Sequence, residues 1–156
     1  MNKTKKNQEQ KLRKIFVYGT LKRGMYNSRF LPNSVIKKME KVTTKGTLYY
    51  ISSGSFPCLK LEGDNTIHGE VYTIHEKHWD RILEDVDCLE GCPTLYTRQI
   101  IKVKNKHGKE FEAWGYIFNG DYMLGREIKD GVFKGPDPYA YRNFQQSLYD
   151  YYYGDF

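Results

Sequence analysis

Strand signals dominate this sequence, and they constrain its fold more than any other feature. Apolar or alternating β-prone segments occur at residues 15–18, 45–51, 66–74, 98–103 and 112–118. Residues 104–109, between the last two segments, contain the Asn and Gly typical of a hairpin turn. Only two stretches have helical spacing, and they lie far apart. Many strands with few, separated helices favour an α+β fold, and we expect a strongly curved mixed sheet or a small barrel.

The first helical stretch is predicted within residues 75–89. Its apolar residues recur at helical spacing, at Trp79, Ile82, Leu83, Val86 and Leu89. The second begins near the C-terminus, where Asp137 has the character of an N-cap and Pro138 that of a first-turn residue. The apolar face expected for this helix consists of Tyr141, Phe144, Leu148 and Tyr152.

The net charge of +6 is concentrated at the N-terminus. Residues 1–14 hold six basic residues and one acidic residue, and the rest of the chain sums to about +1. We therefore expect residues 1–14 to form a disordered basic leader and residues 15–156 to form a single domain. A nucleic-acid arm or a surface tether is the alternative interpretation of the leader, but the nearly neutral body predicts no nucleic-acid partner.

The cysteine content and hydropathy indicate where the protein resides. The chain has three cysteines, an odd number, which favours free thiols in a reducing compartment. No apolar run is long enough to cross a bilayer, and the N-terminus lacks the apolar centre of a secretory signal. These features predict a cytoplasmic protein without a membrane partner.

Glu90 is the first candidate for a chemical role. At about 100° per residue, it projects within about 20° of Trp79, inside the apolar stripe of the first helix. A carboxylate facing the core has its pKa raised towards neutrality, which suits general acid/base catalysis. The alternative is that Gly91 ends the helix early and Glu90 turns to solvent.

A glycine-containing turn at residues 18–24 (YGTLKRG) is the second candidate. Gly19 permits backbone angles that point successive N–H groups in one direction, and such a nest binds a carboxylate or a developing oxyanion. The turn is similar in spacing to a phosphate-binding G-x-x-x-x-G-K-[ST] loop. Because Met25 and Tyr26 follow Gly24, we exclude a nucleotide site. A tight connection without any binding role is the alternative.

Six segments together resemble the γ-glutamylcyclotransferase-like family, also called AIG2-like. They are residues 16–24 (FVYGTLKRG), 56–59 (FPCL), 69–72 (GEVY), 86–91 (VDCLEG), 96–98 (YTR) and 113–116 (AWGY). The resemblance spans about residues 15–118 in the family's order. It implies a small mixed β-barrel with flanking helices, in agreement with the strand pattern.

The resemblance also implies an activity that needs no cofactor or metal. The α-amine of a γ-glutamyl amide attacks its own γ-carbonyl, which releases 5-oxoproline and a free amine. The family's catalytic glutamate falls on Glu90. The substrate-binding residues implied are Tyr18, Gly19, Thr20, Leu21, Phe56 and Pro57. A small-molecule γ-glutamyl substrate is therefore the expected partner.

Two neighbouring residues receive structural roles. We expect Arg98 to pair with an acid on a strand and Asp87 to accept a hydrogen bond at the helix end. The chain departs from the family at Ser28, where His is common, and at Cys92, where an aromatic residue is usual. The change at Cys92 lies beside Glu90 and bears on the identity of the substrate.

Three alternative functions remain open. A zinc site could use His75, His78, Cys88 and Cys92, but on one continuous helix these four ligands could not converge. A cysteine nucleophile would be Cys58 or Cys88, although no sequence feature lowers the pKa of either thiol. A non-catalytic module of the same fold could bind a small ligand, but a binder gains little from burying Glu90.

Overall fold

Five strands close into a mixed β-barrel. The computed structural model describes residues 12–154. Its strands are β1 (Lys14–Val17), β2 (Ile36–Ile51), β3 (Pro57–Ile74), β4 (Tyr96–Asn105), β5 (Glu110–Phe118) and β6 (Leu124–Glu127). The strand order is β3-β1-β5-β4-β2-β6, and β2 also pairs with β3, which closes the barrel and leaves β6 as an added strand. The pairing of β1 with β5 is parallel and the others are antiparallel. The predicted mixed β-barrel is confirmed.

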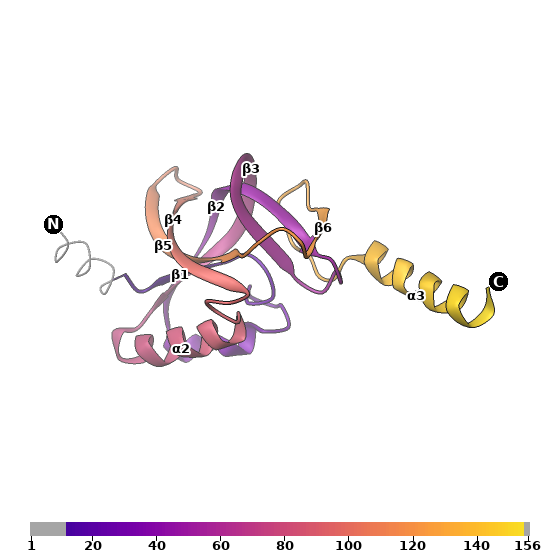
Figure 1. The fold of residues 1–156 in the computed structure, drawn as a ribbon. Helices are drawn as coiled ribbons and strands as arrows, with labels where there is room; N and C mark the ends of the chain where they lie inside the picture. Colours follow the sequence, from indigo (N-terminus) through magenta and orange to yellow (C-terminus); the bar gives the residue numbers. More distant parts are fainter. Residues whose placement is uncertain (1–11, 155–156) are drawn as a thin grey trace.

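The helices lie outside the barrel (Figure 1). They are the short η1 (Ser28–Phe30), η2 (Asn33–Val35) and η3 (Glu76–His78), followed by α2 (Trp79–Leu89) and α3 (Pro138–Tyr153). The helix α2 runs along one side of the barrel, whereas α3 extends away from it. No helix within residues 12–154 is long and apolar enough to span a membrane. Of the predicted leader, residues 1–11 lie outside the described residues, and β1 already begins at Lys14.

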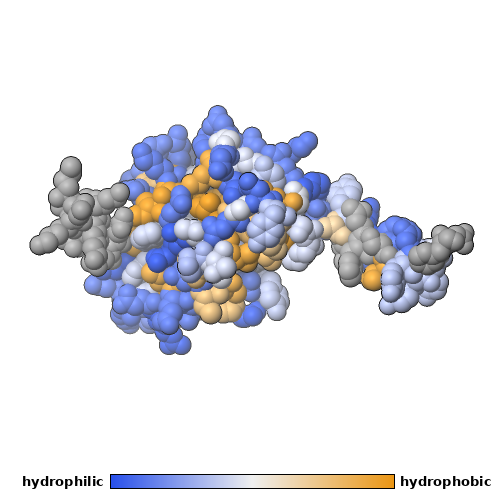
Figure 2. Space-filling model, in the orientation of Figure 1, coloured by the Kyte–Doolittle hydropathy of each residue, from blue (hydrophilic) through white to orange (hydrophobic). Residues whose placement is uncertain are grey.

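The start of α3 follows the prediction, and Leu148 and Tyr152 of its expected apolar face are exposed. The Asp137 side chain accepts a hydrogen bond from the Tyr139 N–H (3.0 Å), as an N-cap does, and Pro138 occupies the first turn. Leu148 is 41% exposed and Tyr152 is 70% exposed. The far end of the helix carries mainly weakly polar side chains (Figure 2), and none of the α3 side chains that the structure describes belongs to the buried core.

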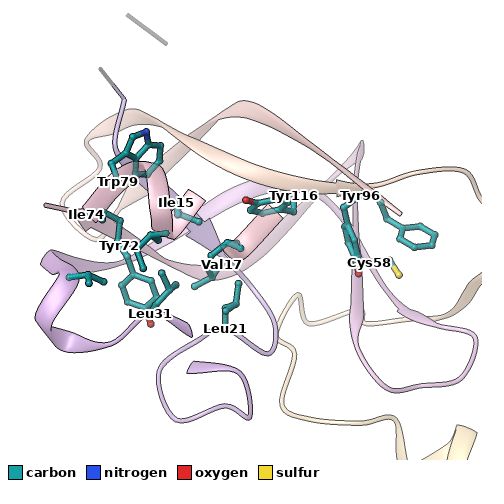
Figure 3. Packing of buried hydrophobic residues seen from close by; sticks show 14 of the residues in the cluster. Ile15, Val17, Leu21, Leu31, Cys58, Tyr72, Ile74, Trp79, Tyr96 and Tyr116 are labelled. Carbon is teal, nitrogen blue, oxygen red and sulfur yellow. The ribbon is translucent and has the colours of Figure 1, made fainter. Parts of the chain in front are cut away.

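β1 is buried on both faces and thereby separates two clusters of apolar side chains. Ile15 and Val17 pack in the cluster between the barrel and α2, with Val86 of the helix (Figure 3). Phe16 and Tyr18 point the other way, into the barrel interior. Because successive side chains alternate across a strand, a strand buried on both faces is a continuous apolar run. The run at residues 15–18 therefore marks the centre of the fold.

Two strands are longer than the sequence predicts. Residues 36–44 of β2 and 57–65 of β3 belong to the sheet but were not expected there. Opposite Gly46 and Thr47 the pairing jumps from Asn65 to Lys60, so residues 61–64 bulge out of the ladder. Residues 37–41 and 61–65 are mainly polar and mostly exposed, which weakens the alternation that identifies a strand, whereas residues 57–59 are buried. The four-residue β6 was missed for its shortness.

Gly69 on β3 permits the close approach of β1. A Cβ atom at this position would overlap the Phe16 ring and lie 2.5 Å from the Val17 carbonyl oxygen. Because that oxygen belongs to the backbone, it cannot move without displacing β1. We predict that Gly69→Ala lowers the free energy of unfolding by about 3 kcal/mol, as overpacking of a core does. Urea-induced unfolding followed by circular dichroism measures this loss.

Gly108→Ala is the matched control for this substitution. Gly108 lies in the β4–β5 turn at φ +79° with no atom near its missing Cβ, so only backbone strain opposes the change. We expect a loss of about 1 kcal/mol there. Equal losses for the two variants would contradict the role assigned to Gly69.

Candidate active site

Glu90 caps the C-terminal end of α2. The helix ends at Leu89, and Glu90 retains helical dihedral angles while its N–H donates to the Val86 carbonyl (2.9 Å). Gly91 follows at φ +63°, the left-handed conformation that ends many helices. The sequence allowed either a helix continuing through Glu90 or an early end that turned Glu90 to solvent. The helix does end at this point, yet Glu90 is half-buried and lines a cavity.

The cavity lies between α2 and the end of β1, and it encloses about 290 Å³. All seven residues that the sequence analysis singled out line it: Tyr18, Gly19, Thr20, Leu21, Phe56, Pro57 and Glu90. They come from the loop after β1, the loop before β3 and the end of α2. The three segments are far apart in sequence, and barrel closure together with α2 packing brings them to one place.

The carboxyl group of Glu90 is held in an environment that disfavours its charge. Burial raises the pKa of Glu90 from 4.5 to about 7. Within residues 12–154, no ion pair or hydrogen bond to this carboxyl group offsets the loss of water. A carboxyl group with a pKa near neutrality can both accept and donate a proton at physiological pH.

The loop after β1 presents unused hydrogen-bond donors. The N–H groups of Gly19, Thr20 and Leu21 have no acceptor within residues 12–154. Asn27 holds this loop in place, since its N–H donates to the Thr20 carbonyl (2.8 Å) and its side-chain amide donates to Thr20 Oγ1 (3.0 Å). Backbone N–H groups without partners at the wall of a cavity are suited to binding an anion.

Gly19 is required for a different reason than predicted. Its φ is not in the left-handed region, so the loop does not depend on the freedom of glycine at this position. A Cβ atom there would lie 2.6 Å from Cγ and 2.8 Å from Cδ of Pro57. The glycine therefore allows the loop after β1 to contact the loop before β3, and this contact shapes the cavity.

Buried tyrosines brace the cavity wall. The Tyr18 hydroxyl donates to the Tyr116 carbonyl (2.6 Å) and accepts from the Leu59 N–H (3.3 Å), while the Tyr96 hydroxyl donates to the Pro57 carbonyl (2.7 Å). Burial, followed by the charge of Glu90, raises the pKa of Tyr18, so this phenol remains protonated. These bonds join β1, β3, β4 and β5 directly around Glu90.

A polar network lies behind this wall. Asp87 on α2 accepts from the Tyr116 hydroxyl (2.6 Å), as expected for a hydrogen-bond acceptor near the helix end, and Arg98 Nε lies 3.2 Å from the same carboxylate. Arg98 therefore pairs with an acid, but the acid is on a helix and not on a strand as predicted. The Arg98 guanidinium also stacks on the Trp114 ring, 4.7 Å from its centroid.

The alternative centres lack suitable geometry. Cys58 is fully buried, and burial raises the pKa of its thiol to about 12, which opposes formation of a nucleophilic thiolate. Cys88 is exposed on α2 and does not line the cavity. Within residues 12–154, no group of three His, Cys, Asp or Glu side chains is arranged to hold a metal ion.

Some lining residues were not predicted. They are Phe16, Val17, Tyr26, Asn27, Ser55, Leu89, Leu95, Tyr96 and Tyr116. Tyr96 and Tyr116 stand in segments that carried the family resemblance, and this could have identified them. Tyr26 is 79% exposed. It lines the cavity because of the path that its loop takes, and no sequence pattern predicts this path.

The fold and site define a small closed β-barrel in which a half-buried carboxyl group and a loop with unbonded backbone N–H groups line one cavity. A sequence model of the family described as "Gamma-glutamyl cyclotransferase, AIG2-like" matches residues 15–135. The chain therefore belongs to this family.

Individual relatives agree with this assignment. The chain is 36% identical over 107 residues to a Methanocaldococcus jannaschii relative, provisionally named a gamma-glutamylcyclotransferase; the match covers 67% of this chain and 82% of that protein. It is 32% identical over 121 residues to gamma-glutamylaminecyclotransferase A of Danio rerio, covering 70% and 73%. The crystal structure of an AIG2-like protein from Mus musculus superimposes with a TM-score of 0.62 at 24% identity, covering 81% and 97%. This last likeness supports the fold.

The burial of Glu90 predicts a pH-dependent stability. Its pKa is raised in the folded state, so the unfolded chain binds fewer protons between about pH 4.5 and 7. The contribution of Glu90 to stability therefore falls as pH rises through this window and is constant above it. We predict that Glu90→Gln stabilises the protein by about 1–3 kcal/mol at pH 8 and gives no such gain at pH 4. Urea-induced unfolding at both pH values measures the difference.

Glu84→Gln serves as the control, because Glu84 is exposed on the same helix. It should change stability little at either pH. A Glu90→Gln variant that is less stable than the wild type at pH 8 would show that the charged carboxylate is stabilised by a partner.

Proposed function

We propose that the protein releases an amine and 5-oxoproline from a γ-glutamyl amide, with Glu90 as the acid/base. The observation that carries the proposal is the cavity itself, where a carboxyl group of pKa about 7 and a loop of unbonded N–H groups face the same space. Family membership supports the reaction class, and the name of the Danio rerio relative supports a γ-glutamyl amine as its substrate.

The proposed reaction needs few groups because the nucleophile belongs to the substrate. The α-amine attacks the γ-carbonyl carbon of the same glutamyl unit, which forms the ring C–N bond. The bond to the leaving amine then breaks. Holding the chain folded supplies much of the rate, since reacting atoms that are tethered and aligned have high effective molarity. No cofactor or metal is required by this scheme.

Glu90 is proposed to move the proton. As carboxylate, it accepts a proton from the α-amine nitrogen as that nitrogen bonds to the γ-carbonyl carbon, and as carboxylic acid it returns this proton to the departing nitrogen. A single group can do both when its pKa lies near the working pH. The pKa of about 7 supports this double role, whereas a solvated glutamate would be too weak a base.

The loop after β1 is proposed to bind negative charge. Among the described residues that line the cavity there is no Lys or Arg, so the substrate carboxylate or the developing oxyanion would be held by the N–H groups of Gly19, Thr20 and Leu21. Preorganised backbone dipoles stabilise such charge effectively where water is excluded. The absence of a lining cation also keeps the pKa of Glu90 high.

Removing the carboxylate should strongly reduce turnover. We predict that Glu90→Gln lowers kcat by roughly 10²–10⁴-fold, the usual contribution of a general acid/base group. The assay measures 5-oxoproline and free amine released from a panel of γ-glutamyl amides, with Glu84→Gln as the control. Turnover that survives in Glu90→Gln would remove Glu90 from the proposed role.

The non-catalytic alternative gives a different result in the same experiment. A binding module would release no 5-oxoproline from any panel member, even as the wild type, while retaining measurable affinity for one of them. The unpartnered, desolvated carboxyl group of Glu90 argues against this alternative, because a binder gains nothing from such an unfavourable burial.

The pH profile tests the protonation state of Glu90. Because the base must be deprotonated in the free enzyme, kcat/KM should rise about tenfold per pH unit below about pH 7 and then level off or meet a second limb. An acidic limb near pH 4.5 would assign the base to a solvated carboxylate and contradict the proposal.

A further inference from the structure

A second cavity, which we call the basic cavity, lies outside the candidate active site. It encloses about 550 Å³ and is lined by residues of the loop after β1, β2, β3, the β4–β5 hairpin and the loop before α3. Its charged or titratable lining residues are Lys22, Arg23, Lys41, His68, Glu70, Lys104 and Lys106. The loop after β1, β2 and the β4–β5 hairpin thus bring five cationic side chains together, and β3 adds a single acid.

The five cationic groups have no acidic partners. Within residues 12–154, none of them takes part in a salt bridge. The one acid, Glu70, is buried and already accepts hydrogen bonds from the Arg23 N–H (2.7 Å) and the Tyr72 hydroxyl (2.8 Å). Glu70 therefore holds the backbone of the loop, and its single negative charge offsets only part of the positive charge of the five cations.

Part of this positive charge is withdrawn from water. The Lys22 ammonium group donates to the Phe133 carbonyl (2.7 Å), and burial lowers the pKa of Lys22. Arg23 stacks on the Tyr72 ring at 5.4 Å from its centroid. A concave surface lined by charges of one sign focuses the electric field and raises the local concentration of counter-ions.

We propose that the basic cavity binds a small phosphate-bearing polyanion, such as an oligophosphate or the phosphate chain of a nucleotide. Its volume lies in the range of small-molecule sites, about 300–1,000 Å³. Lysine ammonium and arginine guanidinium groups are the usual side-chain donors to phosphate oxygens. The cations converge on a hollow, which favours a compact ligand over an extended nucleic acid.

The position of this cavity connects it to the candidate active site. Gly19, Thr20 and Leu21 line one cavity, and the next two residues, Lys22 and Arg23, line the other. A polyanion bound to Lys22 and Arg23 would therefore lie against the same loop that lines the candidate active site with Gly19, Thr20 and Leu21. The proposal concerns binding and does not depend on the proposed reaction.

The double variant Lys104→Gln/Lys106→Gln tests the proposal, since both residues lie on the β4–β5 hairpin away from the candidate active site. Isothermal titration calorimetry of the full chain with tripolyphosphate, at low salt, should give one binding event. We expect the double variant to weaken it at least tenfold, and added salt to weaken it in the wild type. Lys37→Gln/Lys77→Gln is the matched control, because it removes the same charge from exposed positions outside the basic cavity.

Each outcome either supports or overturns the assignment. Equal weakening by both double variants, or no binding by the wild type, would overturn the site. ATP as a second probe separates the two phosphate sources, and tighter binding of ATP than of tripolyphosphate would identify the ligand as a nucleotide. Citrate tests the preference for phosphate. If citrate binds through Lys104 and Lys106 as tightly as tripolyphosphate does, the assignment to a phosphate ligand is overturned. Binding of a single-stranded oligonucleotide without binding of tripolyphosphate would replace the small ligand with nucleic acid.

Discussion

The placement of β1 between β3 and β5, with side chains buried on both faces, is the constraint on which the rest of the structure depends. Its four residues pair antiparallel with β3, and Ile15 pairs in parallel with Trp114 of β5. Ile15 and Val17 pack towards α2, and Phe16 and Tyr18 pack inside the barrel. The strand thus joins both clusters, and its C-terminal end fixes where the loop of residues 19–27 begins. Both cavities described above are lined in part by this loop.

At the candidate active site, the burial of Glu90 lowers the stability of the fold. A carboxyl group with a pKa of about 7 has lost favourable hydration without gaining a partner, and the barrel tolerates this because the surrounding hydrogen bonds of Tyr18, Tyr96 and Tyr116 fix the walls. The same feature that makes Glu90 unfavourable for folding supports its proposed role as a base. Such opposition between local stability and function is common at active sites.

The sequence predicted what depends on local chemistry and periodicity. The apolar run of β1, the N-cap at Asp137 and the fold class followed from side-chain pattern. Periodicity placed Glu90 on the buried side of α2, but it could not decide whether the helix continued. The rest depends on contacts between segments that are far apart in the sequence. Glycine is required at position 19 because of the close contact with Pro57, and Arg98 pairs with an acid on a helix. Tyr26 lines the cavity because of the path of its loop. No pattern within one segment records contacts of this kind.

The closure of the barrel also limits how this chain can associate with copies of itself. A sheet that curls until its first and last strands pair leaves few unsatisfied N–H and C=O groups for another chain to extend. Here β3 meets β2, and the terminal strand of the described sheet is β6, with only four residues. Short outer strands are one way in which natural proteins avoid aggregation through intermolecular sheets. The architecture that assembles the cavity thereby also leaves only a four-residue outer strand at the end of the described sheet, where another chain could add.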